Sequence, residues 1–153
     1  MSQDMKDPDK TKLVGINHLV LEVNDLDAAL EFYGNVFEFE LRGRDDDHRM
    51  VFIDMGDQFL VLSEGRSQAP DGERHFGLVV EDRSDVPALV EKFGGEMLDT
   101  EAMDFRDPWG NHVQVVQYDE VQFTKTGKVM QALGASPKKT KDARAQLEDK
   151  GLT

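Results

Sequence analysis

The chain repeats itself once. The segment HFGLVVED at residues 75–82 repeats HLVLEVND at residues 18–25 at an offset of 57 residues, and the helical patterns after the two segments correspond at an offset of 60. A repeat of this kind indicates two copies of one supersecondary unit, which must pack together to bury a common core. We therefore predict a fold built from two similar modules.

Each module begins with a strand followed by a helix. Residues 14–23 alternate, so that Leu19, Leu21 and Val23 fall on one face of a strand. Asn24 and Asp25 are helix-capping residue types, and a helix is predicted over 29–37. Further strands are expected at 39–41, 49–55 and 58–62, and their second-module counterparts at 105–107 and 113–118. The predicted fold class is α+β: two repeated βαβββ modules form a curved mixed sheet with a concave cup, and the helices lie on its outer face.

The predicted domain organisation has three parts. Residues 1–13 form a flexible N-terminal extension, residues 14–119 the body with modules at about 14–63 and 73–119, and residues 120–153 a helical tail. The tail should contain one helix over 121–133 and another from Ser136-Pro137 to Gly151. It carries seven Lys/Arg against four Asp/Glu, net +3, which leaves −16 on residues 1–119 of a total of −13. The tail therefore docks on the acidic body or on a second subunit, or else is a solvated surface helix.

Composition excludes several classes of function. The chain has no cysteine, which rules out disulfides, thiol nucleophiles and cysteine-based metal sites. A net charge of −13 repels nucleic acid and anionic membranes. No apolar run approaches the roughly 20 residues of a membrane span, and the N-terminus lacks a signal-peptide pattern. We expect a cytoplasmic protein that binds a small molecule, with no nucleic acid or membrane partner.

The polar side chains predicted to face the cup include two histidines at equivalent positions of the repeat. His18 and His75 both lie opposite the apolar face of their strands. In the last strand Val113 and Val115 face the helix, so that His112, Gln114 and Tyr118 line the cup. Two imidazoles and an oxygen ligand suit Fe, Mn, Co, Ni or Zn. The alternative is that each histidine is an ordinary hydrogen-bonded strand residue, and the sequence leaves both interpretations open.

Three segments resemble a known superfamily. INHLVLEVNDLDAALEFY, HFGLVVED and DFRDPWGNHVQVV, in which a D-P-x-G turn precedes the last strand, look like the modules of vicinal oxygen chelate proteins. That superfamily contains glyoxalases, bleomycin-resistance proteins and extradiol dioxygenases. The resemblance covers about residues 14–118, and MGDQFLVLSEG is especially similar to the fosfomycin-resistance branch.

The resemblance implies a metal site on His18, His75 and Gln114. The family's fourth position falls on Leu60 or Val61, and neither can ligate. Because Gln114 stands where the family usually has Glu, the site loses a negative charge.

Other polar residues are candidates for the same cup. Glu22 and His112 are possible compensating ligands, and Arg106, Tyr118 and Trp109 are candidate substrate contacts, although Trp109 fits a core position better.

Two functions follow from the resemblance. The first is a glyoxalase-like enzyme with isomerase or lyase chemistry, in which a divalent metal (Mn, Fe, Ni, Co or Zn) chelates vicinal oxygens of a small substrate and acts as a Lewis acid. The second is a metal-free small-molecule binding or sequestering protein of the bleomycin-resistance type. The resemblance also implies a homodimer in which one cup can take ligands from two chains.

Overall fold

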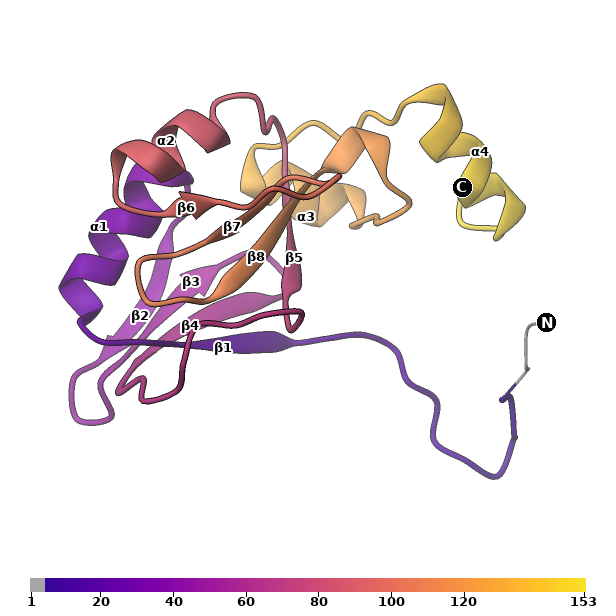
Figure 1. The fold of residues 1–153 in the computed structure, drawn as a ribbon. Coiled ribbons are helices and arrows are strands. Elements are labelled where there is room, and N and C mark those ends of the chain that lie inside the picture. Colours follow the sequence, from indigo (N-terminus) through magenta and orange to yellow (C-terminus); the bar gives the residue numbers. More distant parts are fainter. Residues whose placement is uncertain (1–4) are drawn as a thin grey trace.

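The structure is a computed structural model that describes residues 5–153 (Figure 1). The first module contains β1 (His18–Val23), α1 (Leu26–Val36), β2 (Leu41–Asp45), β3 (Met50–Asp54) and β4 (Phe59–Glu64). The second contains β5 (Phe76–Val80), α2 (Val86–Lys92), β6 (Glu96–Met97), β7 (Asp104–Arg106) and β8 (His112–Gln117). A short 3-10 turn, η1 (Tyr118–Glu120), leads to α3 (Gly127–Leu133) and α4 (Lys141–Asp149).

The two modules have the same topology. The strand order is β1-β4-β3-β2 in the first and β5-β8-β7-β6 in the second, with the outer pairs β1–β4 and β5–β8 parallel and the remaining pairs antiparallel. The α+β class and the two βαβββ modules are therefore confirmed. The strands form two separate sheets of four, one per module, instead of one continuous curved sheet.

One core joins the two modules. Asp25 caps α1 by accepting a hydrogen bond from the amide of Ala28 at 2.8 Å, which fixes where the helix begins. Phe32 and Tyr33 of α1 are buried, and Phe32 contacts Phe105 of the second module, with 6.1 Å between ring centroids. Helices α1 and α2 lie side by side at one end of the molecule (Figure 1). Because both sheets contribute one face to this core, their opposite faces point away from it.

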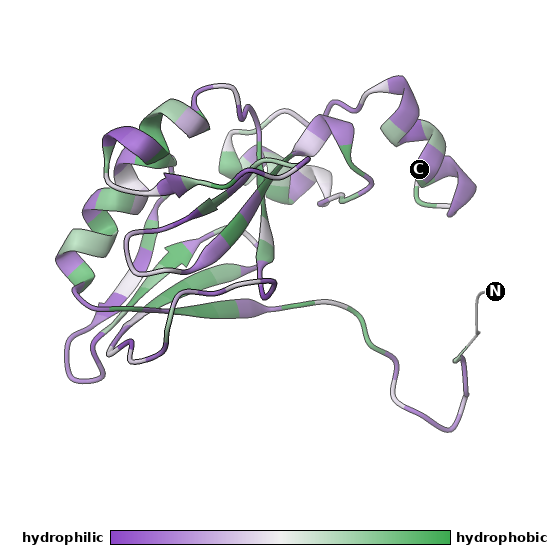
Figure 2. Cartoon of the chain, viewed as in Figure 1, coloured by the Kyte–Doolittle hydropathy of each residue, from purple (hydrophilic) through white to green (hydrophobic). Residues whose placement is uncertain are grey.

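We call these opposite faces the cup faces. In β1, Leu21 and Val23 are buried while His18, Val20 and Glu22 are exposed, as the alternating sequence predicts. Figure 2 shows mostly hydrophobic residues along β1, and on its exposed face Val20 lies between His18 and Glu22.

The tail docks on the body of its own chain, but its helices are shorter than predicted. The helix expected over 121–133 begins only at Gly127, where the Thr126 hydroxyl accepts from the amide of Val129. The helix expected from Ser136-Pro137 begins instead after Thr140, whose side chain accepts from the amide of Ala143. The predicted starts were wrong: ahead of the two helices, Lys125 Nζ donates to Met55 O and the amide of Ser136 donates to Glu81 of the body.

The N-terminal segment lies outside the core. Residues 1–4 of the predicted extension are outside the described residues, and residues 5–13 form no helix or strand and are exposed. Among residues 5–153, no helix is long and apolar enough to cross a membrane.

Candidate functional site

The D-P-x-G turn that precedes β8 is held by a buried carboxylate. Asp107 Oδ1 accepts from the amides of Trp109 (3.0 Å) and Asn111 (2.9 Å), and its Oδ2 accepts from the Tyr33 hydroxyl at 2.8 Å. Gly110 has a φ of +93° and packs so closely on Pro70 that a Cβ would lie 2.7 Å from the proline Cα. These contacts determine where β8 begins, and so where its cup-face side chains lie.

Burial changes the acidity of this network. Desolvation raises the pKa of Asp107, against the lowering effect of its hydrogen bonds to Asn111 and Tyr33. Burial and the neighbouring carboxylate raise the pKa of the Tyr33 phenol well above 10.0. The phenol therefore remains a donor to Asp107, and the pair is structural.

Asn111 connects the turn to both modules. Its Nδ2 donates to Glu22 O at 2.9 Å in β1 and to Asp107 Oδ2 at 2.8 Å. Its Oδ1 accepts from Arg66, whose buried guanidinium lies in the linker between the modules. This network therefore positions the second cup face relative to the first module.

The second cup face is a compact group of polar side chains. His75 lies directly before β5 and His112 begins β8, and their rings stack with centroids 4.8 Å apart. Gln114 follows on the same face of β8, with Gly77 beside it on β5 and Asp104 beside it on β7. The structure thus brings together two predicted residues, His75 and Gln114, and the predicted alternative ligand His112.

All three candidate histidines have the same hydrogen-bonding pattern. Nδ1 lies 2.9 Å from Asn17 Oδ1 in His18, 2.7 Å from Glu73 O in His75 and 2.7 Å from Gly72 O in His112. An oxygen acceptor at Nδ1 fixes the proton there in a neutral imidazole, so Nε2 carries the free lone pair. Metal-binding histidines in proteins usually have this arrangement.

Asp104 was missed by the sequence analysis. Its carboxylate is buried, and Oδ1 has no hydrogen-bond partner among the described residues. The sequence repeat predicts a strand only at 105–107, whereas β7 begins at Asp104, and strand alternation puts Asp104 on the face opposite the buried Phe105.

The first cup face is mostly apolar. His18 stacks on Phe59 with 4.9 Å between ring centroids, and Val61 lies opposite Val20 in the β1–β4 register. In the second module Gln114 lies opposite Gly77, the repeat equivalent of Val20, so Val61 is the first-module counterpart of Gln114. Leu60 belongs to the core. The first module therefore offers one candidate ligand, His18.

The remaining predicted residues have different surroundings. Glu22 is exposed on the first cup face, and Arg106 lies beside His112 with its Nε donating to Asp71 O at 2.8 Å.

Tyr118 was expected on the last strand, but the strand ends at Gln117 and Tyr118 is buried under the tail, with Lys139 Nζ 3.4 Å from its ring centroid. The prediction that Tyr118 lines the cup was wrong, because tail residues cover it. Trp109 packs against the core, as its residue type favours.

The residues present fit a divalent metal in part. His75 offers a free Nε2 and Gln114 an amide oxygen. Gly77 between them leaves space above the sheet, because a Cβ at this position would meet only Gln114 O, at 4.0 Å. Within residues 5–153 of one chain, however, no three His, Asp or Glu side chains converge to hold a metal ion. His18 is on the other sheet, so a complete site requires a ligand from elsewhere.

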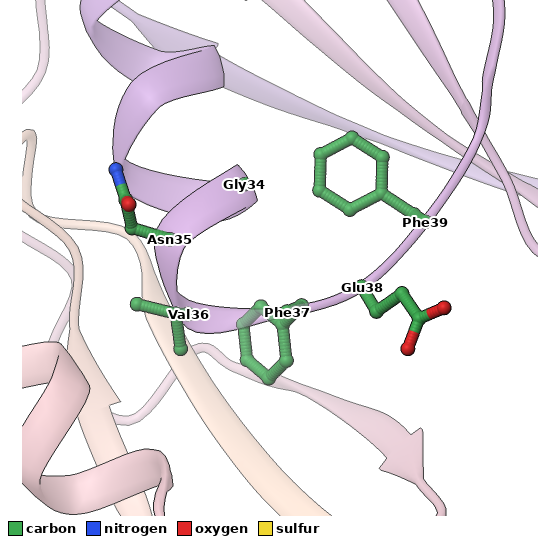
Figure 3. A pocket seen from close by; sticks show the side chains of 6 residues that line it. All are labelled: Gly34, Asn35, Val36, Phe37, Glu38 and Phe39. Carbon is green, nitrogen blue, oxygen red and sulfur yellow. The ribbon is translucent and has the colours of Figure 1, made fainter.

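A surface pocket lies apart from these residues. It is a shallow depression after the end of α1, shown in Figure 3 and lined by Gly34, Asn35, Val36, Phe37, Glu38 and Phe39. It contains none of the candidate ligands.

Comparison with solved structures supports the fold. A variant of the fosfomycin resistance protein FosX from Listeria monocytogenes, complexed with Mn(II) and 1S,2S-dihydroxypropylphosphonic acid, is 18% identical, with a TM-score of 0.59 over 68% of this chain and 90% of that chain. FosX from Mesorhizobium loti is 20% identical (TM-score 0.55, 68% and 92%), and a glyoxalase-related enzyme from Fulvimarina pelagi is 21% identical (TM-score 0.54, 69% and 88%). At these identities the likeness establishes the fold alone.

The family model gives the assignment. None of the curated proteins with which the chain was compared matches it. The model of the Glyoxalase/Bleomycin resistance protein/Dioxygenase superfamily matches residues 15–115, which include the first module, the second module as far as the middle of β8, both cup-face histidines of the repeat and Gln114. The chain, with its two βαβββ modules, belongs to the Glyoxalase/Bleomycin resistance protein/Dioxygenase superfamily.

Proposed function

We propose that this protein is a glyoxalase-like metalloenzyme that binds a small substrate with vicinal oxygens and catalyses isomerase- or lyase-type chemistry. The observation that carries the proposal is the shared state of His18 and His75, both with Nδ1 bonded to an oxygen and Nε2 free on a cup face. The likeness to FosX, which was solved with Mn(II) and a phosphonic acid, supports a divalent metal such as Mn, Fe, Ni, Co or Zn.

The proposed site uses residues of both modules. His75 and Gln114 would hold the metal over Gly77, and His18 would complete the set. A bound divalent metal supplies Lewis-acid polarisation of the substrate oxygens. Arg106, on the same sheet and 30% exposed in its side chain, is placed to contact an anionic group of the substrate.

The proposed active form is a homodimer. His18 is exposed on one sheet and His75 on the other, and both cup faces point away from the common core. A symmetric pairing of two chains would bring the first cup face of one against the second cup face of its partner. Exposed Val20 and Ile16, 50% and 64% accessible, supply apolar surface for that contact.

The test is a calorimetric titration of metal-stripped, untagged protein with Mn, Co, Ni and Zn. We expect one metal per cup, severe weakening in His75→Ala, and tighter binding in Gln114→Glu, which restores an anionic oxygen. His48→Ala is the matched control, because His48 is an exposed histidine bonded to Asp45 on the turn between β2 and β3. Equal weak binding by wild type and His75→Ala would contradict the metalloenzyme.

One observation favours a second function. The apolar Val61 and the neutral Gln114 occupy the two last-strand positions where a metal site of this family would carry ligands. A metal-free protein that sequesters a small molecule between apolar cup faces would have such residues. If Gln114→Glu alone gains metal affinity while the wild type has none, this second function becomes the better proposal.

A further inference from the structure

An unpaired guanidinium lies on the first cup face. Arg42 Cζ is 5.5 Å from the centroid of the Phe59 ring, within the range of a cation–π contact. Because β3 separates β2 from β4 in the sheet, the Arg42 side chain must cross β3 to reach that ring (Figure 1). Within residues 5–153 the guanidinium makes no hydrogen bond or ion pair. Its charge and its N–H donors are therefore available to a group from outside the chain.

A β-bulge gives Arg42 this position. The β2–β3 register shifts between Leu41 and Gly43, so Arg42 is the extra residue of β2. A bulge re-aims a side chain relative to the regular alternation of the strand, and bulges are common beside active sites. The bulge thus explains how an edge-strand arginine comes to extend over the middle of the sheet.

The absence of a carboxylate partner sets Arg42 apart from its neighbour Arg44. Arg44 Nη1 donates to Asp27 at 2.8 Å, and its Nε donates to Asp46 at 2.6 Å. Residues 1–119 carry a net charge of −16, yet none of the described carboxylates pairs with Arg42. A guanidinium presents N–H donors in a planar fork that matches the two oxygens of a carboxylate. Its charge therefore favours an anionic ligand.

The surface beside Arg42 is aromatic. Phe59 stacks on His18 with 4.9 Å between ring centroids and 12° between the ring planes, and Phe52 lies 6.1 Å from Phe59. Gly43, opposite Phe52, adds no side chain to this surface, and a Cβ there would meet no atom within 4 Å. Phe52 and Phe59 are both half-buried, so part of each ring is open to a ligand. A second aromatic ring would pack on them offset or edge-on.

The order of these groups across the sheet sets their order along a ligand. His18 is on β1, Phe59 on β4, and Arg42 reaches in from β2, so the Phe59 ring lies between the imidazole and the guanidinium. The candidate metal ligand is therefore on one side of the aromatic surface and the unpaired cation on the other.

We propose that the small molecule bound by this protein is an aromatic anion: its carboxylate binds Arg42, and its ring packs against Phe59 and Phe52. Its vicinal oxygens, at the opposite end of the ring, point towards His18. This substrate class rests on the proposed function for the vicinal oxygens, whereas the contacts with Arg42 and the two phenylalanines require no metal. Arg42 would then select among substrates by their charge.

The test is an NMR titration of the metal-stripped full-length chain with two probes. Para-(dihydroxyethyl)benzoate has vicinal hydroxyls at one end of the ring and a carboxylate at the other, and phenylethanediol lacks only the carboxylate. Wild type should bind the benzoate at least about tenfold more tightly than the diol, because a charge-assisted pair with Arg42 is formed. Arg42→Gln should lose this preference. Phe52→Leu, which keeps an apolar side chain but removes the ring, should weaken the binding of both probes.

Arg44→Gln is the matched control, since it removes the same charge from the same strand at a guanidinium that is held by Asp27 and Asp46. It should keep the wild-type preference. Equal binding of the two probes by wild type, or an unchanged preference in Arg42→Gln, would overturn the aromatic anion. Weaker dimerisation of Arg42→Gln by sedimentation, with an unchanged preference, would also overturn it, in favour of a contact with a second chain.

The titration contains no metal, so its result is independent of the metal titration that tests the metalloenzyme. A wild type that binds metal but shows no preference for the benzoate retains the proposed function and loses the substrate class. A wild type that binds no metal but loses the preference in Arg42→Gln retains the aromatic anion as the molecule that the metal-free protein sequesters.

Discussion

At the scale of single residues, the hydrogen bonds of the buried Asp107 hold the start of β8, and with it the second cup face, in position. Asp107 accepts four hydrogen bonds, from Tyr33, from Trp109 and twice from Asn111, and so ties α1 to the start of β8. None of these side chains faces the cup, yet the positions of His112 and Gln114 depend on them. A change here should alter stability first and the geometry of the second cup face only as a consequence.

Tyr33→Phe tests this network through its pH dependence. The folded-state pKa of Asp107 is raised above 3.8, so the folded state binds more protons than the unfolded state, and this group's contribution to stability falls as pH rises from 3.8 through the folded pKa. Losing the Tyr33 hydroxyl raises that pKa further. We expect a loss of about 1–2 kcal/mol at neutral pH, and a smaller loss near pH 4.

Urea unfolding of both proteins at the two pH values measures the difference. An equal loss at both would show that Tyr33 contributes packing alone.

The histidine positions could be predicted from sequence, whereas the burial of Asp104 could not. His18 and His75 fall on cup faces because strand alternation is a local property. The surroundings of Asp104 depend on the β7–β8 register, on the Thr100 hydroxyl and on the nearby His112, none of which strand alternation reveals. Tyr118 was misplaced for a similar reason, since its hydroxyl accepts from the amide of Lys125 in the tail, a contact that strand alternation does not reveal.

At the scale of elements, most strands were predictable and the tail helices only in part. The strand expected at 39–41 lies at Leu41–Asp45, and β6 (Glu96–Met97) was not predicted. The β3–β4 turn at Gly56-Asp57 formed where the sequence placed it, and its strands lie within one or two residues of the prediction. The tail differs because Ser136 and Lys139 form hydrogen bonds with residues outside the tail helices. The Glu81 carboxylate accepts from the amide of Ser136, and the Tyr118 carbonyl accepts from Lys139. Capping types alone do not reveal such long-range competition.

Gly56→Ala should loosen α3 from the body. Gly56 has a φ of +85°, and a Cβ there would lie 2.6 Å from Val129 Cγ1 and 3.4 Å from Leu133 Cδ1 of α3. We expect a loss of about 1–2 kcal/mol from the backbone conformation alone. Thermal unfolding measures the loss, and hydrogen exchange of α3 locates it.

Gly127→Ala is the control for this substitution. Gly127 begins α3, has no atom within 4 Å of a Cβ, and has no positive φ. It should be neutral or slightly stabilising. If the two alanine variants unfold alike, the close packing of α3 on Gly56 does not contribute to stability.

At the scale of the whole molecule, the division of eight strands between two sheets matters most. The sequence predicts two modules but not how they pair, because a module can pair with its neighbour in the chain or with the same module of another chain. The linker network of Arg66 and Asn111 fixes the arrangement within the chain, and it leaves both cup faces open.

Mixing two inactive variants tests whether one cup is built from two chains. His18→Ala and His75→Ala should each lose metal binding, but a heterodimer of the two would contain one cup with both histidines intact. Random pairing of equal amounts after co-refolding should recover about a quarter of the wild-type binding capacity. Calorimetry measures the capacity, and sedimentation measures the dimer.

The controls are each variant refolded alone. No recovery in the mixture, with dimers present by sedimentation, would show that each cup takes its histidines from a single chain.

The amine reactivity of two adjacent lysines in the tail depends on whether the tail is docked. Lys139 donates to the carbonyls of Tyr118, Val121 and Phe123, while its neighbour Lys138 is exposed. An ammonium occupied by three carbonyls is a poor nucleophile towards amine-reactive reagents, whereas Lys138 should be labelled at once. The ratio of labelling at these adjacent lysines, measured by mass spectrometry, therefore counts the molecules whose C-terminal segment has detached, without any mutation.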